Sequence, residues 1–147
     1  MTGFMAQALD EARKAAERGE VPVGAVVVRD NNVIARAGNR TLELKDPTAH
    51  AEILAIRMAC EATGNDRLTG CDLYVTLEPC TMCAGALSFA RIRRLYYGAD
   101  DGKGGAVENG VRFFGDPACH HAPDVYSGMA ARESSDLLKA FFRLKRG

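Results

Sequence analysis

Two short motifs that lie far apart in the sequence place the strongest constraint on how this chain folds. The first is His50-Ala51-Glu52, an imidazole followed closely by a carboxylate. The second is Pro79-Cys80-Thr81-Met82-Cys83, whose thiols have the spacing at which side chains meet on one helical turn. An imidazole and two thiolates are ligands that zinc prefers. If they bind one ion, the fold has to bring these two segments together.

Structural zinc sites are usually closed by four protein ligands. Catalytic zinc sites have three protein ligands and leave the fourth position to water, so three ligands here indicate a catalytic site. Zinc lowers the pKa of a bound water from about 16 to about 7, and a general acid or base must then move the proton. Glu52 is placed for this if a helix begins at His50. A helix that begins near Thr81 would also stabilise thiolates at its N-terminus. We therefore predict one zinc ion per chain on His50, Cys80 and Cys83, with Glu52 as the proton shuttle.

Simpler interpretations stay open at this point. Cys80 and Cys83 could be buried thiols or a redox-active pair. Glu52 could be a solvated helix residue or a fourth zinc ligand. A second compact set of potential ligands follows at Cys119, His120 and His121. This set could complete a four-ligand structural site, although the flanking prolines favour a surface loop with non-ligating histidines.

The two motifs together resemble the His-x-Glu and Pro-Cys-x-x-Cys signature of the zinc-dependent cytidine/adenosine deaminase superfamily. Within that superfamily, the chain is similar to the bacterial tRNA-specific adenosine deaminases. The closer likeness covers nearly the whole chain and is carried by residues 21–26, 38–40, 46–53, 73–86, 91–92, 98–99 and 141–143.

The resemblance implies an α/β protein with a three-layer α/β/α cytidine-deaminase-like fold and a five-stranded mixed sheet. The sequence pattern also favours the α/β class, because segments of helical and strand character alternate. We expect one domain over residues 1–147 and a glycine-rich loop over the site at 100–105. The expected helices span about 4–16, 50–62, 84–89 and 134–146, and the expected strands 23–29, 33–37, 73–77, 95–97 and 125–126.

The resemblance further implies hydrolytic deamination of adenosine to inosine at the wobble position of a tRNA anticodon. In this chemistry water attacks purine C6, while Glu52 moves protons to the ring nitrogen and to the departing ammonia. The partners implied are the tRNA anticodon stem-loop and a second copy of the chain in a homodimer. The substrate-binding residues implied are Asn39, Ala51, Asp101, Lys103, Phe142 and Arg146.

Several of these residues have a structural interpretation as well. Asn39 could be a turn residue after Gly38. Asp101 and Lys103 could be solvated loop charges, and Phe142 could belong to the core. The cations near the C-terminus, among them Arg146, could complement the end of a helix rather than bind RNA. The formal net charge of zero, with 19 basic and 19 acidic residues, gives RNA binding no support by itself.

Two other functions fit the same motifs. A deaminase of a free nucleobase or nucleoside, such as guanine, cytosine or cytidine, would use the same zinc chemistry. A non-catalytic, zinc-stabilised RNA-binding module would need a fourth protein ligand on the metal. The intact Glu52 argues against the second alternative.

Composition indicates where such a protein would work. Five cysteines, an odd number, argue against a disulfide framework and favour a reducing compartment. No segment approaches the roughly 20 apolar residues of a membrane span, and the N-terminus lacks the layout of a signal peptide. We expect a cytoplasmic protein without membrane association.

Overall fold

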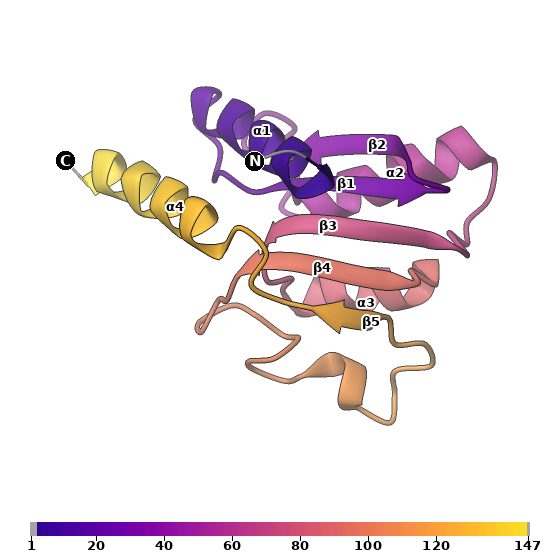
Figure 1. Cartoon of the computed structure of the whole chain (residues 1–147). Helices are drawn as coiled ribbons and strands as arrows, with labels where there is room; N and C mark the ends of the chain where they lie inside the picture. Colours follow the sequence, from indigo (N-terminus) through magenta and orange to yellow (C-terminus); the bar gives the residue numbers. More distant parts are fainter. Residues whose placement is uncertain (1–2, 147) are drawn as a thin grey trace.

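A mixed sheet organises residues 3–146, the part of the chain that this computed structural model describes (Figure 1). The strand order is β2-β1-β3-β4-β5. Strand β1 is antiparallel to β2 and β3, whereas β3, β4 and β5 run parallel to one another. The five-stranded mixed sheet implied by the resemblance is therefore confirmed. The strands are β1 (Gly24–Arg29), β2 (Asn32–Gly38), β3 (Cys71–Leu77), β4 (Arg94–Ala99) and β5 (Asp124–Tyr126).

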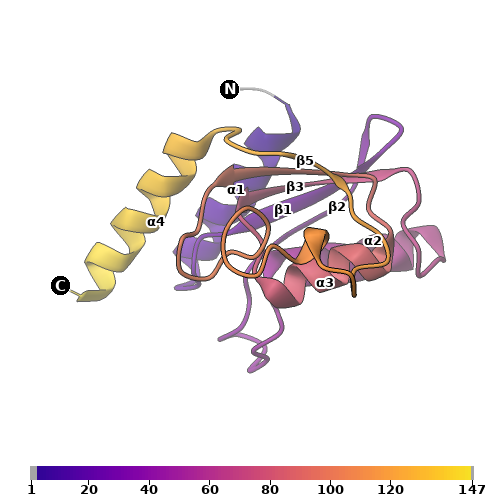
Figure 2. The same ribbon diagram turned by 90° about the horizontal axis from the view of Figure 1, so that it is seen from below.

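Helices cover both faces of the sheet and form the outer two of three layers. Helices α2 and α3 lie on one face, and α1 lies on the other (Figure 2). Helix α4 follows β5, contacts β3, β4 and α1, and then extends beyond the sheet (Figure 1). The helices are α1 (Phe4–Glu17), α2 (Ala51–Thr63), α3 (Thr81–Ala90) and α4 (Ala131–Arg146), with a short 3₁₀ helix η1 (Phe113–Gly115) before β5.

Several element boundaries differ by a few residues from the sequence expectation, and the starts of β3 and α4 are two examples. Strand β3 begins at Cys71 rather than at 73, and α4 begins at Ala131 rather than at 134. The start of α4 is tied to the sheet, because the buried hydroxyl of Ser134 donates a hydrogen bond to the backbone oxygen of Thr76. Within residues 3–146, no helix is both long and apolar enough to cross a membrane.

The core lies on both sides of β1. Ala25 and Val27 pack into the layer beneath α2 and α3. Val26 and Val28 pack on the opposite face against α1. A strand that is buried on both faces has no polar alternation, which explains the uninterrupted aliphatic run in this strand.

Helix α1 lies unusually close to the first hairpin. A Cβ atom at Gly24 would lie 2.0 Å from the backbone oxygen of Ala8, so only glycine permits this contact. The approach places the C-terminal end of α1, and Glu20 just beyond it, beside the loop that precedes α2. The packing of α1 thus helps to position the segment that leads to His50.

Candidate active site

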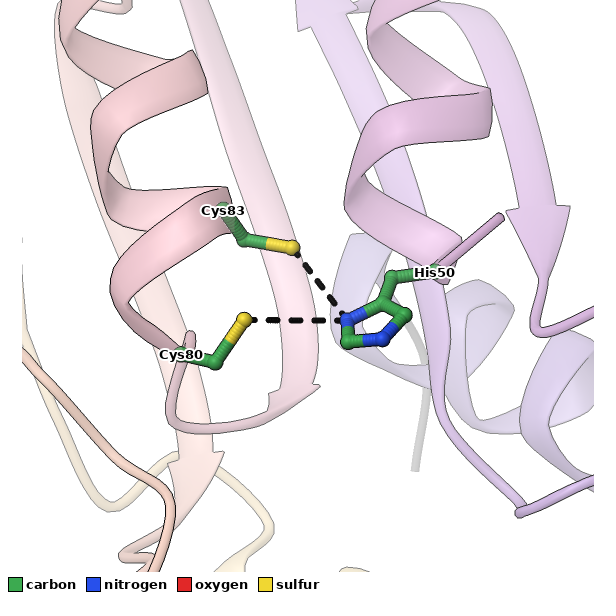
Figure 3. A group of neighbouring side chains, drawn as sticks. All are labelled: His50, Cys80 and Cys83. Carbon is green, nitrogen blue, oxygen red and sulfur yellow. Dashed lines mark hydrogen bonds between the residues drawn. The ribbon is translucent and has the colours of Figure 1, made fainter. Parts of the chain in front are cut away.

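The proposed zinc ligands come from the starts of two helices that lie side by side on the same face of the sheet (Figure 3). His50 is the residue immediately before α2, and Cys80 is the residue immediately before α3. Cys83 lies in the first turn of α3, where the spacing after Cys80 turns its thiol toward the same point. Pro79 lies between the end of β3 and the start of α3, and it keeps Glu78 extended because the residue before a proline disfavours helical backbone.

The three donor atoms have the separations that one zinc ion requires. His50 Nδ1 lies 3.7 Å from Cys80 Sγ and 3.5 Å from Cys83 Sγ. Tetrahedral zinc, with bonds of about 2.0 Å to nitrogen and 2.3 Å to sulfur, places such atoms about 3.6 Å apart. These two distances therefore suit one zinc ion, and all three donor atoms lie within 4.8 Å of one another. Across residues 3–146, no other cluster of three His, Cys, Asp or Glu side chains could hold a metal ion.

The two thiols have opposite acid–base properties in the metal-free protein. A hydrogen bond from Cys83, together with the nearby imidazole of His50, lowers the pKa of Cys80 to about 4. Cys83 has a strongly raised pKa, because it donates that hydrogen bond and because it is buried beside a thiolate. The hydrogen bond with Cys80 likewise raises the pKa of His50. A lowered pKa at Cys80 favours the thiolate, which is the form of cysteine that binds zinc.

Glu52 lies in the first turn of α2, beside the ligands, with 4% of its surface exposed. Burial raises the pKa of its carboxyl group to about 7, and the Cys80 thiolate adds to the shift. The charge of His50 and a hydrogen bond with Cys83 act in the opposite direction. A carboxyl group with a pKa near neutrality can both accept and donate a proton, which suits a general acid–base role.

Asn39 follows β2 and forms part of the support for α2. Its side-chain oxygen accepts a hydrogen bond from the backbone N–H of Ala51 at 2.8 Å. Both residues are buried. The bond occupies the backbone donor of Ala51 but not the side-chain nitrogen of Asn39. Substrate contacts by these two residues remain predictions.

The other predicted substrate-binding residues line one groove. Asp101 and Lys103 contribute from the loop after β4, and Phe142 and Arg146 contribute from α4. The groove has a volume of about 910 Å³, and Leu77 at the end of β3 lies in its wall. Phe142 has 45% of its surface exposed, so the interpretation of this residue as core is wrong. The fold therefore brings together four residues from two segments that are distant in the sequence.

Two buried glutamates hold loops around the site. Glu20 accepts backbone hydrogen bonds from Leu42 and Glu43 in the loop that precedes α2. Glu78 accepts hydrogen bonds from the loop after β4. A bond from a backbone amide was one open interpretation of Glu78 beside Pro79, whereas nothing in the spacing of Glu20 indicated its role. The one available signal was a carboxylate placed directly beside Pro79 and the apolar strand β3.

The second set of potential ligands does not form a metal site within the described residues. The thiol of Cys119 donates to the backbone oxygen of His121 at 3.1 Å and lies 3.5 Å from the hydroxyl of Ser88. The Nε2 atom of His121 lies 2.7 Å from the backbone oxygen of Ile92. Cys119 and His121 therefore join the loop before β5 to the end of α3 and the segment that follows it.

The zinc cluster lies within a region that a known family model matches. Residues 2–99 match the model described as the cytidine and deoxycytidylate deaminase zinc-binding region. The chain belongs to this deaminase family. The zinc-binding character of the family agrees with the fitted donor set of His50, Cys80 and Cys83.

Relatives within the deaminase family match almost the full length. The chain is 72% identical over 145 residues to the tRNA-specific adenosine deaminase of Agrobacterium fabrum, covering 99% of this chain and 95% of that protein. A solved structure from studies of A-to-I editing by tRNA:A34 deaminases at the wobble position shares 73% identity. Its TM-score is 0.91, with 92% of this chain and 98% of that chain covered.

A second solved structure of similar fold comes from a protein with a different activity. The guanine deaminase of Bacillus subtilis is 32% identical in the superposed structures, with a TM-score of 0.66. The comparison covers 99% of this chain and 94% of the Bacillus chain. The zinc-binding fold is therefore similar to that of proteins that act on different purine substrates.

Proposed function

We propose that this chain converts adenosine to inosine at the wobble position of tRNA anticodons. The observation that carries the proposal is the 72% identity to a tRNA-specific adenosine deaminase over nearly the full chain. The geometry supports it, because His50, Cys80 and Cys83 suit one zinc ion and Glu52 lies buried beside them.

In this proposal Glu52 is the catalytic acid–base residue. His50, Cys80 and Cys83 would hold a zinc ion, which would lower the pKa of a water molecule next to the purine. Deamination consumes that water, forms a bond from oxygen to C6 and breaks the bond from C6 to nitrogen. Glu52 accepts one proton from the water and delivers it to the ring nitrogen, and then takes the second proton from the same oxygen and passes it to the amino group, which leaves as ammonia. Burial raises the pKa of Glu52, which favours a carboxyl group that can both take up and release a proton.

The substrate-binding residues have distinct proposed roles. The side-chain nitrogen of Asn39 and the peptide of Ala51 contact the purine. A base in an anticodon loop is already unpaired, so little energy is needed to place it in the pocket. Lys103 and Arg146 contact phosphates along the groove, and Asp101 hydrogen-bonds to the adjoining sugars. The exposed ring of Phe142 provides a surface on which a neighbouring base can stack.

We also propose that the chain acts as one domain, in the cytoplasm, and as a homodimer. Support for the dimer comes from apolar side chains that are exposed on α2 and α3. Met58 lies on α2, and Met82 and Phe89 lie on α3, where Phe89 has 77% of its surface exposed. Light scattering should give twice the mass of the chain for the wild type. A monomeric mass across the micromolar range would overturn the dimer.

The test of the proposed function is a direct assay of the reaction. Zinc-loaded protein is incubated with an anticodon stem-loop that carries adenosine at the wobble position, and the nucleoside products are measured by mass. A stem-loop with guanosine at that position serves as the control substrate. We expect inosine from the first only, and no inosine with Glu52→Ala, which should retain its zinc. Full turnover by Glu52→Ala would contradict the catalytic role.

One alternative substrate class is supported by a specific observation. The 32% identity to the Bacillus subtilis guanine deaminase makes a free purine base the second candidate. Guanine, cytosine, cytidine and adenosine are therefore assayed in parallel. Product from a free base, together with an unreacted stem-loop, would replace the proposed substrate while retaining the zinc chemistry.

A further inference from the structure

Glu78 is a buried carboxylate that accepts five hydrogen bonds from one loop. Only 2% of its surface is exposed. Its Oε1 atom accepts the backbone N–H of Asp101 at 2.9 Å and the side-chain N–H of Asn109 at 2.7 Å. Its Oε2 atom accepts the backbone N–H groups of Val107, Glu108 and Asn109 at 3.1, 2.8 and 3.0 Å. A buried carboxylate is stable only when its oxygens are satisfied in this way.

The loop from 101 to 109 is folded closely around this carboxylate. A Cβ atom at Gly105 would lie 2.5 Å from the carboxyl carbon of Glu78 and 2.5 Å from the backbone oxygen of Asp101. The next residue, Ala106, donates its backbone N–H to the oxygen of Pro79 at 2.9 Å. The loop is therefore attached to the two residues that directly precede the zinc ligand Cys80.

The same loop forms one wall of the groove. Asp101, Lys103 and the glycines beside them line the groove opposite α4. The carboxylate of Asp101 accepts the backbone N–H groups of Lys103 and Gly104 at 3.1 and 2.9 Å, which holds the tip of the loop as a turn. Glu78 binds the backbone of Asp101 itself. A shift of the Glu78 carboxylate would therefore move this wall of the groove relative to the zinc site.

We infer that Glu78 is a positioning residue that sets the distance between the zinc site and the loop that binds the nucleotides flanking the target base. The inference rests on the proposed function, since it assigns Glu78 to recognition of the RNA substrate. Glu78 does not touch the reacting atoms in this inference. Its effect is transmitted through Asp101 and Lys103, and it therefore acts on substrate affinity more than on the chemical step.

The test variant is Glu78→Gln, which preserves the shape of the side chain but replaces one acceptor oxygen with a donor. Whichever way the amide points, at least two loop N–H groups lose their acceptor. We expect KM for the anticodon stem-loop to rise about tenfold, the order expected for lost hydrogen bonds to a charged acceptor. We expect kcat to change less than about twofold, because the zinc ligands and Glu52 are untouched.

The matched control is Glu61→Gln, which removes the same charge from an exposed position on α2. Both variants lose one negative charge, and this loss by itself favours RNA binding slightly. Only Glu78→Gln also loses hydrogen bonds to the loop, so the difference between the two variants reports those hydrogen bonds. We expect KM and kcat of the control to equal those of the wild type. Zinc content should be the same in all three proteins.

Amide hydrogen exchange provides a readout that does not depend on RNA. The N–H groups of Asp101, Val107, Glu108 and Asn109 should be protected in the wild type and should exchange faster in Glu78→Gln. If Glu78→Gln does not fold, Asn109→Ala removes a single contact and should raise KM about twofold to threefold. Unchanged KM with accelerated exchange would overturn the role in substrate positioning. Unchanged exchange would overturn the anchoring of the loop.

The same experiment distinguishes this inference from the proposed function. A wild-type protein that leaves the stem-loop unreacted contradicts the proposed function and, with it, the role of Glu78 in RNA recognition. A wild-type protein that is active, with a variant of equal KM, contradicts only the inference.

Discussion

The side-chain oxygen of Asn39 accepts the backbone N–H of Ala51 at 2.8 Å, and this bond joins the end of β2 to the start of α2. The first N–H groups of a helix have no partner within the helix. Asn39 therefore satisfies a buried donor in the turn that carries His50 and Glu52. The residue thus has a structural role in addition to its predicted contact with the purine, and the two roles can be separated by mutation.

Replacing Asn39 should separate helix support from substrate binding. Asn39→Ala leaves the N–H of Ala51 without an acceptor and should lower the free energy of unfolding by about 1–3 kcal/mol. Asn39→Asp retains an acceptor and should remain within about 0.5 kcal/mol of the wild type. The aspartate lacks the amide donor, so deamination should still be lost. Denaturation curves and the stem-loop assay measure the two effects, and an active Asn39→Asp protein would contradict the purine contact.

The close packing of Gly105 predicts a position-dependent effect within one loop. Gly105→Ala places a methyl group against Glu78 and the backbone of Asp101 and should destabilise the protein by about 1–3 kcal/mol. Gly102→Ala is the matched control, because a Cβ atom there meets nothing within 4 Å. Thermal denaturation should show a clear decrease in Tm for the first variant only. Equal Tm values for the two variants would contradict this prediction, because they would mean that the loop accommodates the added methyl group without loss of stability.

Loss of a zinc ligand should remove the metal, and loss of another cysteine should not. Cys83→Ala should reduce the zinc content from about one ion per chain toward zero and abolish deamination. Cys60→Ala, on the far part of α2, should retain both zinc and activity. Metal analysis after dialysis measures the content. Treatment of the wild type with a chelator should lower Tm, and a Tm that does not respond would contradict a zinc ion bound to the folded state.

The Glu78 carboxylate should make stability depend on pH in a defined window. Burial raises its pKa, but hydrogen bonds from Asp101, Asn109 and Glu108 outweigh burial and bring the pKa below its ordinary value of 4.5. The unfolded chain therefore binds this proton at a higher pH than the folded chain does. The stabilisation is complete above pH 4.5 and is lost as pH falls through the lowered value.

Urea denaturation of the wild type and Glu78→Gln measures this difference directly. The gap in unfolding free energy between the two proteins should be constant from pH 7 down to about 5 and should narrow at lower pH. Other carboxylates titrate in both proteins, so their contributions cancel in the difference. A gap that widens as pH falls would have the wrong sign for a carboxylate with a lowered pKa.

Local spacing in the sequence identified the candidate zinc ligands, but only the fold shows that His50 meets the two cysteines. The thiols of Cys80 and Cys83 meet on one helical turn whenever that turn forms, and Glu52 follows His50 closely enough to share its surroundings. The alternation of helices and strands indicated the α/β class for the same reason, because each periodicity is a local property of the chain. The five-stranded mixed sheet came from the family resemblance and is confirmed.

Only the tertiary structure decided how the surrounding side chains are used. Glu78 holds the loop after β4 because five N–H groups of that loop donate hydrogen bonds to its carboxylate. Helix α3 and strand β4 separate Glu78 from this loop in the sequence. The groove exists because β5 returns the chain so that α4 lies opposite that loop. The burial and the hydrogen-bond partners of a side chain depend on where distant segments of the chain lie. The spacing of residues in the sequence does not determine those positions. The candidate zinc ligands could therefore be recognised from short sequence motifs. The contacts of Glu78 and the groove depend on the tertiary structure.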